Sequence, residues 1–127
     1  MFSDSEIQKK AQTMYNNALF GIRKQGCQSL GSDDFVCMYR GDNGTKCALG
    51  HSIPDAEYRS AFEGCGIANN TFNFARNWFV KSFGEGCMEL AYSLQMIHDK
   101  NYANFELQMK ACAEQYGLTY TSLEHSV

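Results

Sequence analysis

The sequence predicts a mostly α-helical domain of the α+β class, in which four to five helices pack against one small β-hairpin. Apolar residues recur with the period of a helix in both halves of the chain, while a glycine-rich stretch between Gly26 and Gly50 carries an alternating pattern instead. With 127 residues, 44% of them apolar, the chain can bury about two-thirds of its unfolded surface in one core. No repeat or linker divides it, so we expect a single domain over residues 1–127.

A long first helix is predicted between Ser3 and Gly26. Ser3 and Glu6 form a capping-box pair at its start. Phe2 and Ile7 stand at the positions of a hydrophobic staple, and Gly26 supplies the stop. The residues expected on its buried face are spaced by three or four positions: Ile7, Ala11, Met14, Ala18 and Ile22.

A hairpin and a short helix are predicted next. Residues 35–39 (Phe-Val-Cys-Met-Tyr) alternate as in a strand, a turn is expected at Asp42-Asn43-Gly44, and residues 45–48 form the returning strand. Pro54 stands where a first helical turn begins, and acidic residues follow it. We therefore expect a short helix from Pro54 to Phe62, ending at residues 64–66.

The second half of the sequence predicts further helices. Thr71 is placed to cap a helix rich in aromatic residues, and the glycines at 84 and 86 interrupt the apolar pattern, giving either two helices or one with a break. A last helix is expected over residues 101–116, with Gly117 ending it and Leu118 making the hydrophobic contact that follows such a cap. Residues 119–121 could add a short strand.

Charge and cysteine content narrow the class of protein. The net charge is -3 and no run of Lys or Arg occurs, which argues against general nucleic-acid binding, whereas a small anion needs only one or two cations. The six cysteines are scattered singly, so we expect free thiols and a cytoplasmic protein. No stretch has the apolar length of a membrane span and no leader is visible, so neither export nor anchoring is expected.

Residues 37–58 gather cations, glycines, tyrosines and an imidazole in one loop-rich region. Arg40 offers a planar fork for phosphate or carboxylate, Lys46 adds a second charge, and the tyrosines could stack on a ring. The alternative is that the hairpin packs over the helices, with Arg40 paired to Asp55 or Asp99. The predicted ligand-binding residues are Tyr39, Arg40, Gly41, Gly44, Thr45, Lys46, His51, Tyr58 and His98.

Two other chemistries remain open in the sequence. A metal site would use Cys37, Cys47 and His51, with a fourth ligand from Cys27, Cys65 or His98. The sequence lacks the close C-x2-C pairing of common zinc modules. A thiol enzyme would use Cys47 or Cys37 with His51 or His98 as base. Since neighbouring helical residues do not face each other, we expect His98 to act as a polar anchor and not as a proton-transfer pair with Asp99. We expect no catalysis, no cofactor and no metal.

The chain resembles a family of small, uncharacterised bacteriophage and bacterial proteins. The resemblance rests on Tyr39-Arg40, Lys46-Cys47-Ala48 with Gly50, Ile53-Pro54-Asp55 with Tyr58, and a helix carrying Leu94, Gln95, His98 and Asp99. The resemblance implies origin and fold, namely a phage-type accessory protein in the host cytoplasm, and the family has no established activity. Together with the chemistry of residues 37–58, it leads us to expect a protein that counters host defence by sequestering a small nucleotide-derived signal. The rival hypothesis is an inhibitor that covers a host enzyme with the aromatic residues 72–83, and either protein could be a homo-oligomer.

Overall fold

The computed structural model describes five stretches of the chain, residues 4–29, 38–41, 44–63, 73–100 and 102–123. Within them the fold is all-α and no β-strand occurs. The four α-helices are α1 (Ser5–Gln25), α2 (Phe74–Phe83), α3 (Met88–Lys100) and α4 (Phe105–Tyr116).

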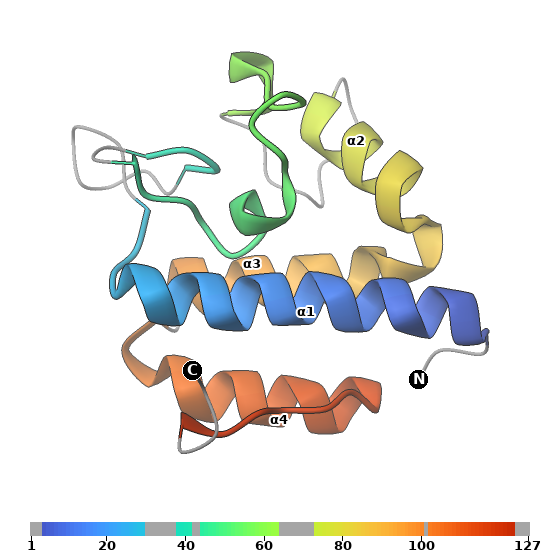
Figure 1. Cartoon of the computed structure of the whole chain (residues 1–127), viewed down its shortest axis with the longest axis vertical. Coiled ribbons are helices and arrows are strands. Elements are labelled where there is room, and N and C mark those ends of the chain that lie inside the picture. Colours follow the sequence, from blue (N-terminus) through green and yellow to red (C-terminus); the bar gives the residue numbers. More distant parts are fainter. Residues whose placement is uncertain (1–3, 30–37, 42–43, 64–72, 101, 124–127) are drawn as a thin grey trace.

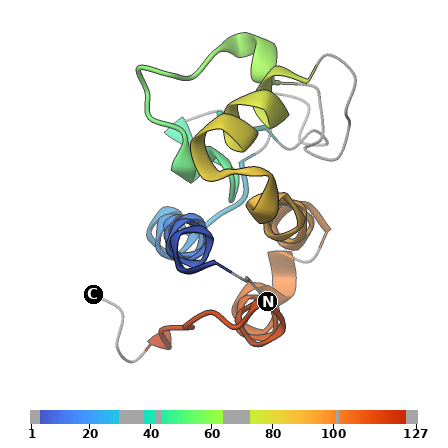
Figure 2. The same ribbon diagram turned by 90° about the vertical axis from the view of Figure 1, so that its right-hand side faces the viewer.

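The helices form three layers. α1 and α3 run side by side in the middle layer, and α4 covers one side of this pair (Figures 1 and 2). α2 and residues 44–63 cover the opposite side (Figure 2). The central position of α1 explains why it buries two sets of residues, since the middle layer is covered on both sides.

The buried face of α1 follows the prediction and extends beyond it. Four of the five predicted residues are buried, Ile7 is half-buried, and Tyr15 and Leu19 are buried in addition. The Tyr15 hydroxyl donates a hydrogen bond of 2.6 Å to the Met109 carbonyl, which ties α1 to α4. Gly26 ends the helix in the left-handed conformation (φ 77°), as predicted.

The N-terminal caps differ from the predicted ones. Asp4, not Ser3, caps α1, and its Oδ1 accepts from the Glu6 N–H at 2.7 Å. Asn73, not Thr71, caps α2, and its Oδ1 accepts from the Arg76 N–H at 2.9 Å. Ser3 and Thr71 themselves lie outside the described residues. In both helices a short side chain closer to the first turn satisfies the free backbone N–H groups.

The predicted break after α2 is confirmed as two helices. Gly84 takes a φ of 95°, and the 3-10 turn η4 (Glu85–Cys87) leads into α3. The last helix begins later than predicted, because the 3-10 turn η5 (Tyr102–Asn104) occupies its expected first turn. Its predicted end at Gly117 is confirmed, with φ 68° and a bond of 2.8 Å from the Leu118 N–H to the Ala113 carbonyl.

The structure differs from the sequence prediction at three elements: the hairpin, the helix over residues 54–62 and the strand at residues 119–121. The described part of the predicted hairpin is one isolated antiparallel bridge between Arg40 and Lys46; residues 35–37 and 42–43 lie outside the described stretches. The predicted helix over residues 54–62 is a turn followed by the 3-10 turn η3 (Ser60–Phe62). The tail forms no strand there, because the Gln12 amide bonds both backbone groups of Thr119, at 2.8 and 3.0 Å.

Candidate functional site

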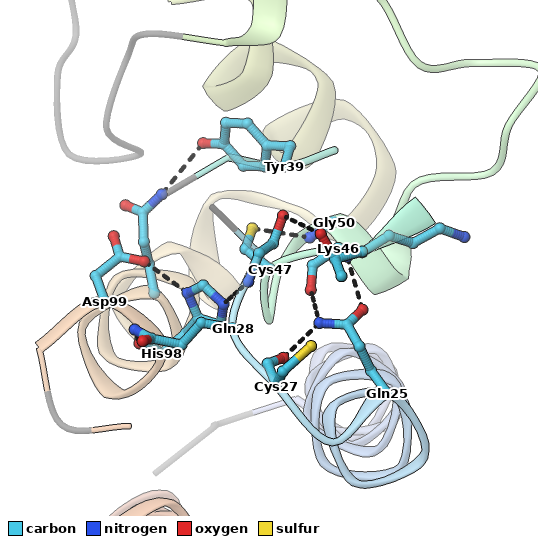
Figure 3. Close-up of polar contacts among 12 residues, drawn as sticks. Gln25, Cys27, Gln28, Tyr39, Lys46, Cys47, Gly50, His98 and Asp99 are labelled. Carbon is cyan, nitrogen blue, oxygen red and sulfur yellow. Dashed lines mark hydrogen bonds and ion pairs between the residues drawn. The ribbon is translucent and has the colours of Figure 1, made fainter. Parts of the chain in front are cut away.

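The segment that carries the predicted site is held against the end of α1 by one amide side chain. Gln25 Oε1 accepts from the Lys46 N–H at 2.7 Å, and Gln25 Nε2 donates to the carbonyls of Lys46 and Cys27 at 2.9 and 2.6 Å. In Figure 3 the Lys46 side chain extends away from this amide. The backbone at Lys46 is therefore fixed, while its side chain reaches outward from the amide.

Glu63 organises the other side of the segment. Its two carboxylate oxygens accept from the backbone N–H groups of Tyr39 and Arg40 at 2.9 and 3.0 Å. The Tyr58 hydroxyl donates to the same carboxylate at 2.6 Å. Burial and the neighbouring Glu63 raise the pKa of Tyr58 to about 12, so this phenol remains a donor at neutral pH. Glu63 thus sets the relative positions of Arg40 and Tyr58.

The two cations predicted to bind an anion share one carboxylate. Arg40 Nη1 lies 2.7 Å and Lys46 Nζ 3.8 Å from Asp55 Oδ1. Arg40 Nη2 also donates to the Ile53 carbonyl at 2.6 Å, and its guanidinium lies 4.8 Å from the centre of the Tyr58 ring. The Asp55 side chain is 84% exposed, and Arg40 holds the pKa of its carboxyl below the usual range. The pairing with Asp55 predicted as the alternative is therefore present, but at the surface.

Two open grooves meet at this place. The first, about 460 Å³, is lined by Asp55 and by six predicted residues: Arg40, Gly41, Gly44, Thr45, Lys46 and Tyr58. The second, about 610 Å³, is lined by the predicted residues Gly44, Thr45, Lys46 and His51 and by Gly21, Lys24, Gln25 and Cys27 of the α1 end. Both volumes fall in the range of small-molecule sites. We call them the Arg40 groove and the His51 groove.

Tyr39 and His98 lie beneath the surface that carries the grooves. Tyr39 is 3% exposed, its ring lies 6.5 Å from that of Phe79, and its hydroxyl accepts a hydrogen bond from Gln95 at 3.4 Å. Burial raises its pKa. His98 is fully buried on α3. Neither position favours direct contact with a ligand in the grooves.

His98 is the polar anchor that the sequence predicts, but its pairing with Asp99 corrects the prediction. His98 Nε2 accepts from the Ser29 backbone N–H at 3.0 Å, so the proton is on Nδ1, which donates to Asp99 at 2.8 Å (Figure 3). The Gln28 amide adds a bond of 2.7 Å to the His98 carbonyl. The expectation that His98 and Asp99 do not face each other was wrong, because the side chains bend toward each other at the end of α3.

Cys47 is poorly placed to act as a nucleophile. It is buried, and its Sγ accepts from the Gly50 N–H at 3.3 Å. Burial raises the pKa of its thiol to about 12, so it stays protonated near neutral pH. The alternative nucleophile, Cys37, lies outside the described residues.

Within the described stretches no group of three His, Cys, Asp or Glu side chains is arranged to hold a metal. The four cysteines described there, Cys27, Cys47, Cys87 and Cys112, are free thiols, as predicted.

The aromatic residues of α2 are largely core. Phe79 and Phe83 are buried, and Trp78 packs edge-on against Phe79 with its Nε1 donating to Glu57 at 3.0 Å. Phe74 is 56% exposed, and Phe72 lies outside the described residues.

His51 should make the stability of the fold sensitive to acid. Burial, together with the positive charges of Lys46 and Arg40, lowers its pKa to about 4 from 6.5. Since the folded state disfavours the proton, the contribution of the neutral ring is complete above pH 6.5 and is lost as the pH falls toward 4. Over this pH range, we expect the free energy of unfolding to fall by about 2 kcal/mol more in wild type than in His51→Gln. Urea unfolding at pH 7 and 4.5 measures this, and equal losses in both proteins would contradict it.

Several residues of the site were missed by the sequence reasoning. No sequence motif marks Gln25, Lys24 or Glu63 as part of a site. Their roles arise only when segments distant in the sequence pack together. Gly21 did give a signal, because an isolated glycine inside a helical pattern often marks a close approach.

Comparisons with protein-family models, with curated proteins and with solved structures find no match for this chain. In the described residues, no helix has the length and apolar character needed to cross a membrane. The resemblance to phage proteins therefore stays a prediction, and the two grooves are the structural features from which a function can be proposed.

Proposed function

We propose that the chain binds a small anionic, nucleotide-derived ligand in the Arg40 groove and holds it without turning it over. The observation that carries this proposal is the sharing of one exposed carboxylate, Asp55, by two cations that line an open groove. Among the side chains that line the groove, the two positive charges of Arg40 and Lys46 exceed the one negative charge of Asp55. A ligand phosphate or carboxylate is the natural partner for this excess of positive charge.

The Asp55 contacts are weak enough to be exchanged. An ion pair with a partner as exposed as Asp55 contributes little to stability, because water screens the attraction. A phosphate that bonds a guanidinium at two points and an ammonium besides gains about 1.5–3 kcal/mol per charged hydrogen bond. The guanidinium is already oriented by the Ile53 carbonyl and the Tyr58 ring, so little further ordering is needed on binding.

Asp55→Asn is expected to tighten ligand binding, while Arg40→Ala and Lys46→Ala weaken it. Removing the competing carboxylate should lower the Kd of pyrophosphate about fivefold, the equivalent of a weak ion pair. Removing either cation should raise it at least about tenfold. Isothermal titration calorimetry of the full chain at constant ionic strength gives these constants.

Lys110→Ala supplies the control, because Lys110 is an exposed cation on α4, in the layer on the other side of α1. The Kd of pyrophosphate for Lys110→Ala should equal that for wild type. If Asp55→Asn binds pyrophosphate no better than wild type, and Lys110→Ala weakens binding as much as Arg40→Ala does, the attraction is a general charge effect and the Arg40 groove is not the site.

Sequestration is the biological role we propose for such a site, on the basis of the resemblance to phage accessory proteins. Native mass spectrometry of protein purified from cells, followed by denaturation, tests it. An intact nucleotide released in stoichiometric amount supports sequestration. If neither wild type nor Asp55→Asn retains a nucleotide, the result contradicts sequestration and favours the rival hypothesis of an inhibitor that binds a host enzyme. Phe74, the exposed aromatic residue of α2, is then the first residue to replace.

A further inference from the structure

Three unfavourable local features coincide at His51. Gly21 lies inside α1, where glycine is less favourable than alanine because it loses more backbone entropy on folding. His51 Nε2 is buried without a hydrogen-bond partner in the described part of the chain. The surroundings also depress the pKa of the ring, so it is held neutral. Several locally unfavourable features at one residue are most often found where that residue has a function.

Gly21 is required by the position of the His51 ring. A Cβ atom at residue 21 would lie 2.4, 2.5 and 2.8 Å from three ring atoms, which is far inside van der Waals contact. The glycine therefore lets the imidazole lie directly against the backbone of α1. Any side chain at residue 21 would push the ring away from the helix.

The His51 groove continues from the Arg40 groove. Gly44, Thr45 and Lys46 line both, so Lys46 belongs to the groove that contains the His51 ring and to the groove that contains the Arg40 guanidinium. The His51 groove is the larger of the two. Its one aromatic side chain in the described residues is the His51 imidazole.

We propose that the His51 groove is a ring subsite, which takes the planar base of a nucleoside phosphate whose phosphate group is held by Arg40 and Lys46. This inference rests on the proposed function and narrows its ligand to a molecule with one planar base joined to an anionic group. A neutral imidazole suits this role, since it packs against a heterocycle without repelling or attracting charge, as histidine does with unstacked bases.

The test compares ribose 5-phosphate, which has the phosphate and no base, with AMP, GMP, CMP and UMP. In wild type at least one nucleotide should bind about tenfold more tightly than ribose 5-phosphate. His51→Ala, which removes the ring, should reduce this advantage to less than about twofold. The affinity for ribose 5-phosphate itself should stay unchanged, because the cations remain.

Gly21→Ala is the second variant. It keeps the His51 ring, whereas His51→Ala removes it, but it forces the ring into the groove. It too should abolish the advantage of the nucleotides. Combining it with His51→Ala separates binding from folding, because alanine at residue 21 then meets no ring and should favour α1. The double variant should be at least as stable as His51→Ala alone in urea unfolding, even though Gly21→Ala alone is less stable than wild type.

The outcomes distinguish the two proposals. If ribose 5-phosphate binds as tightly as all four nucleotides, the ring subsite is wrong and the anion site stands. If nucleotides keep their advantage in both His51→Ala and Gly21→Ala, the base binds elsewhere and the ring subsite is again wrong. If neither ribose 5-phosphate nor any nucleotide binds, the anion site fails and the ring subsite fails with it.

Discussion

Glu106→Gln is expected to lower the free energy of unfolding by about 3 kcal/mol, although it replaces one side chain with another of nearly the same shape. Both Glu106 oxygens bond Arg23, at 2.6 and 2.7 Å, and one also accepts from the Tyr120 hydroxyl at 2.8 Å. The Arg23 side chain is only 9% exposed. The neutral amide would take a full negative charge away from this largely buried guanidinium.

The pair joins three parts of the chain. Arg23 is on α1, Glu106 on α4, and Arg23 Nη2 also donates to the Thr121 carbonyl of the tail at 2.7 Å. Arg23 holds the pKa of Glu106 below its usual 4.5. The ionised carboxylate therefore stabilises the fold above that pH, and this contribution is lost as the pH falls through the folded-state value.

Glu85→Gln is the matched control for this prediction. Glu85 pairs with Arg76 at 3.0 Å, but its side chain is 71% exposed. Its replacement should change the stability by less than about 1 kcal/mol. Urea unfolding at pH 7 compares the two variants. If both lose the same small amount, the Arg23–Glu106 pair is no more than an ordinary surface contact.

Gly50→Ala is expected to lower the stability by about 2–3 kcal/mol and to disrupt both grooves. A Cβ at residue 50 would lie 2.2 Å from the Tyr39 carbonyl oxygen and 3.1 Å from its carbon. These are backbone atoms, so no side-chain rotation relieves the clash. The segment carrying Arg40 must then move away from the one carrying Lys46, and the bridge between them should open.

Hydrogen exchange of backbone amides shows whether this happens. The N–H groups of Gly41 and Lys46, which bond Thr45 and Gln25 in wild type, should exchange faster in Gly50→Ala. Gly86→Ala is the control, since its Cβ would meet only side-chain atoms of the half-buried Ile7, at 3.2 Å. Unchanged exchange in Gly50→Ala would show that the 39–50 contact is not what holds the segment closed.

The elements predicted best are those with local determinants. The helical period between Ile7 and Ile22, the stop at Gly26, the break at Gly84 and the cap at Gly117 all depend on residues close in sequence. The predicted helix after Pro54 failed although Pro54 and its acidic neighbours favour a helix start. There Arg40 bonds Ile53 and Asp55, and Glu63 bonds Tyr58, so contacts from other segments outweigh the local preference.

The sequence alone determined that the chain is helical, where α1, α2 and α4 end, and that residues 37–58 bring cations and glycines together. Periodicity, caps and residue chemistry are local properties, so neighbours in the chain are enough to set them. Only the tertiary structure decided which of those residues reach the surface. It buried Tyr39 and His98, left Arg40 and Lys46 sharing an exposed Asp55, and brought Gly21 of α1 against the ring of His51. Burial and pairing depend on how distant segments pack, and no pattern of neighbours in the chain encodes that.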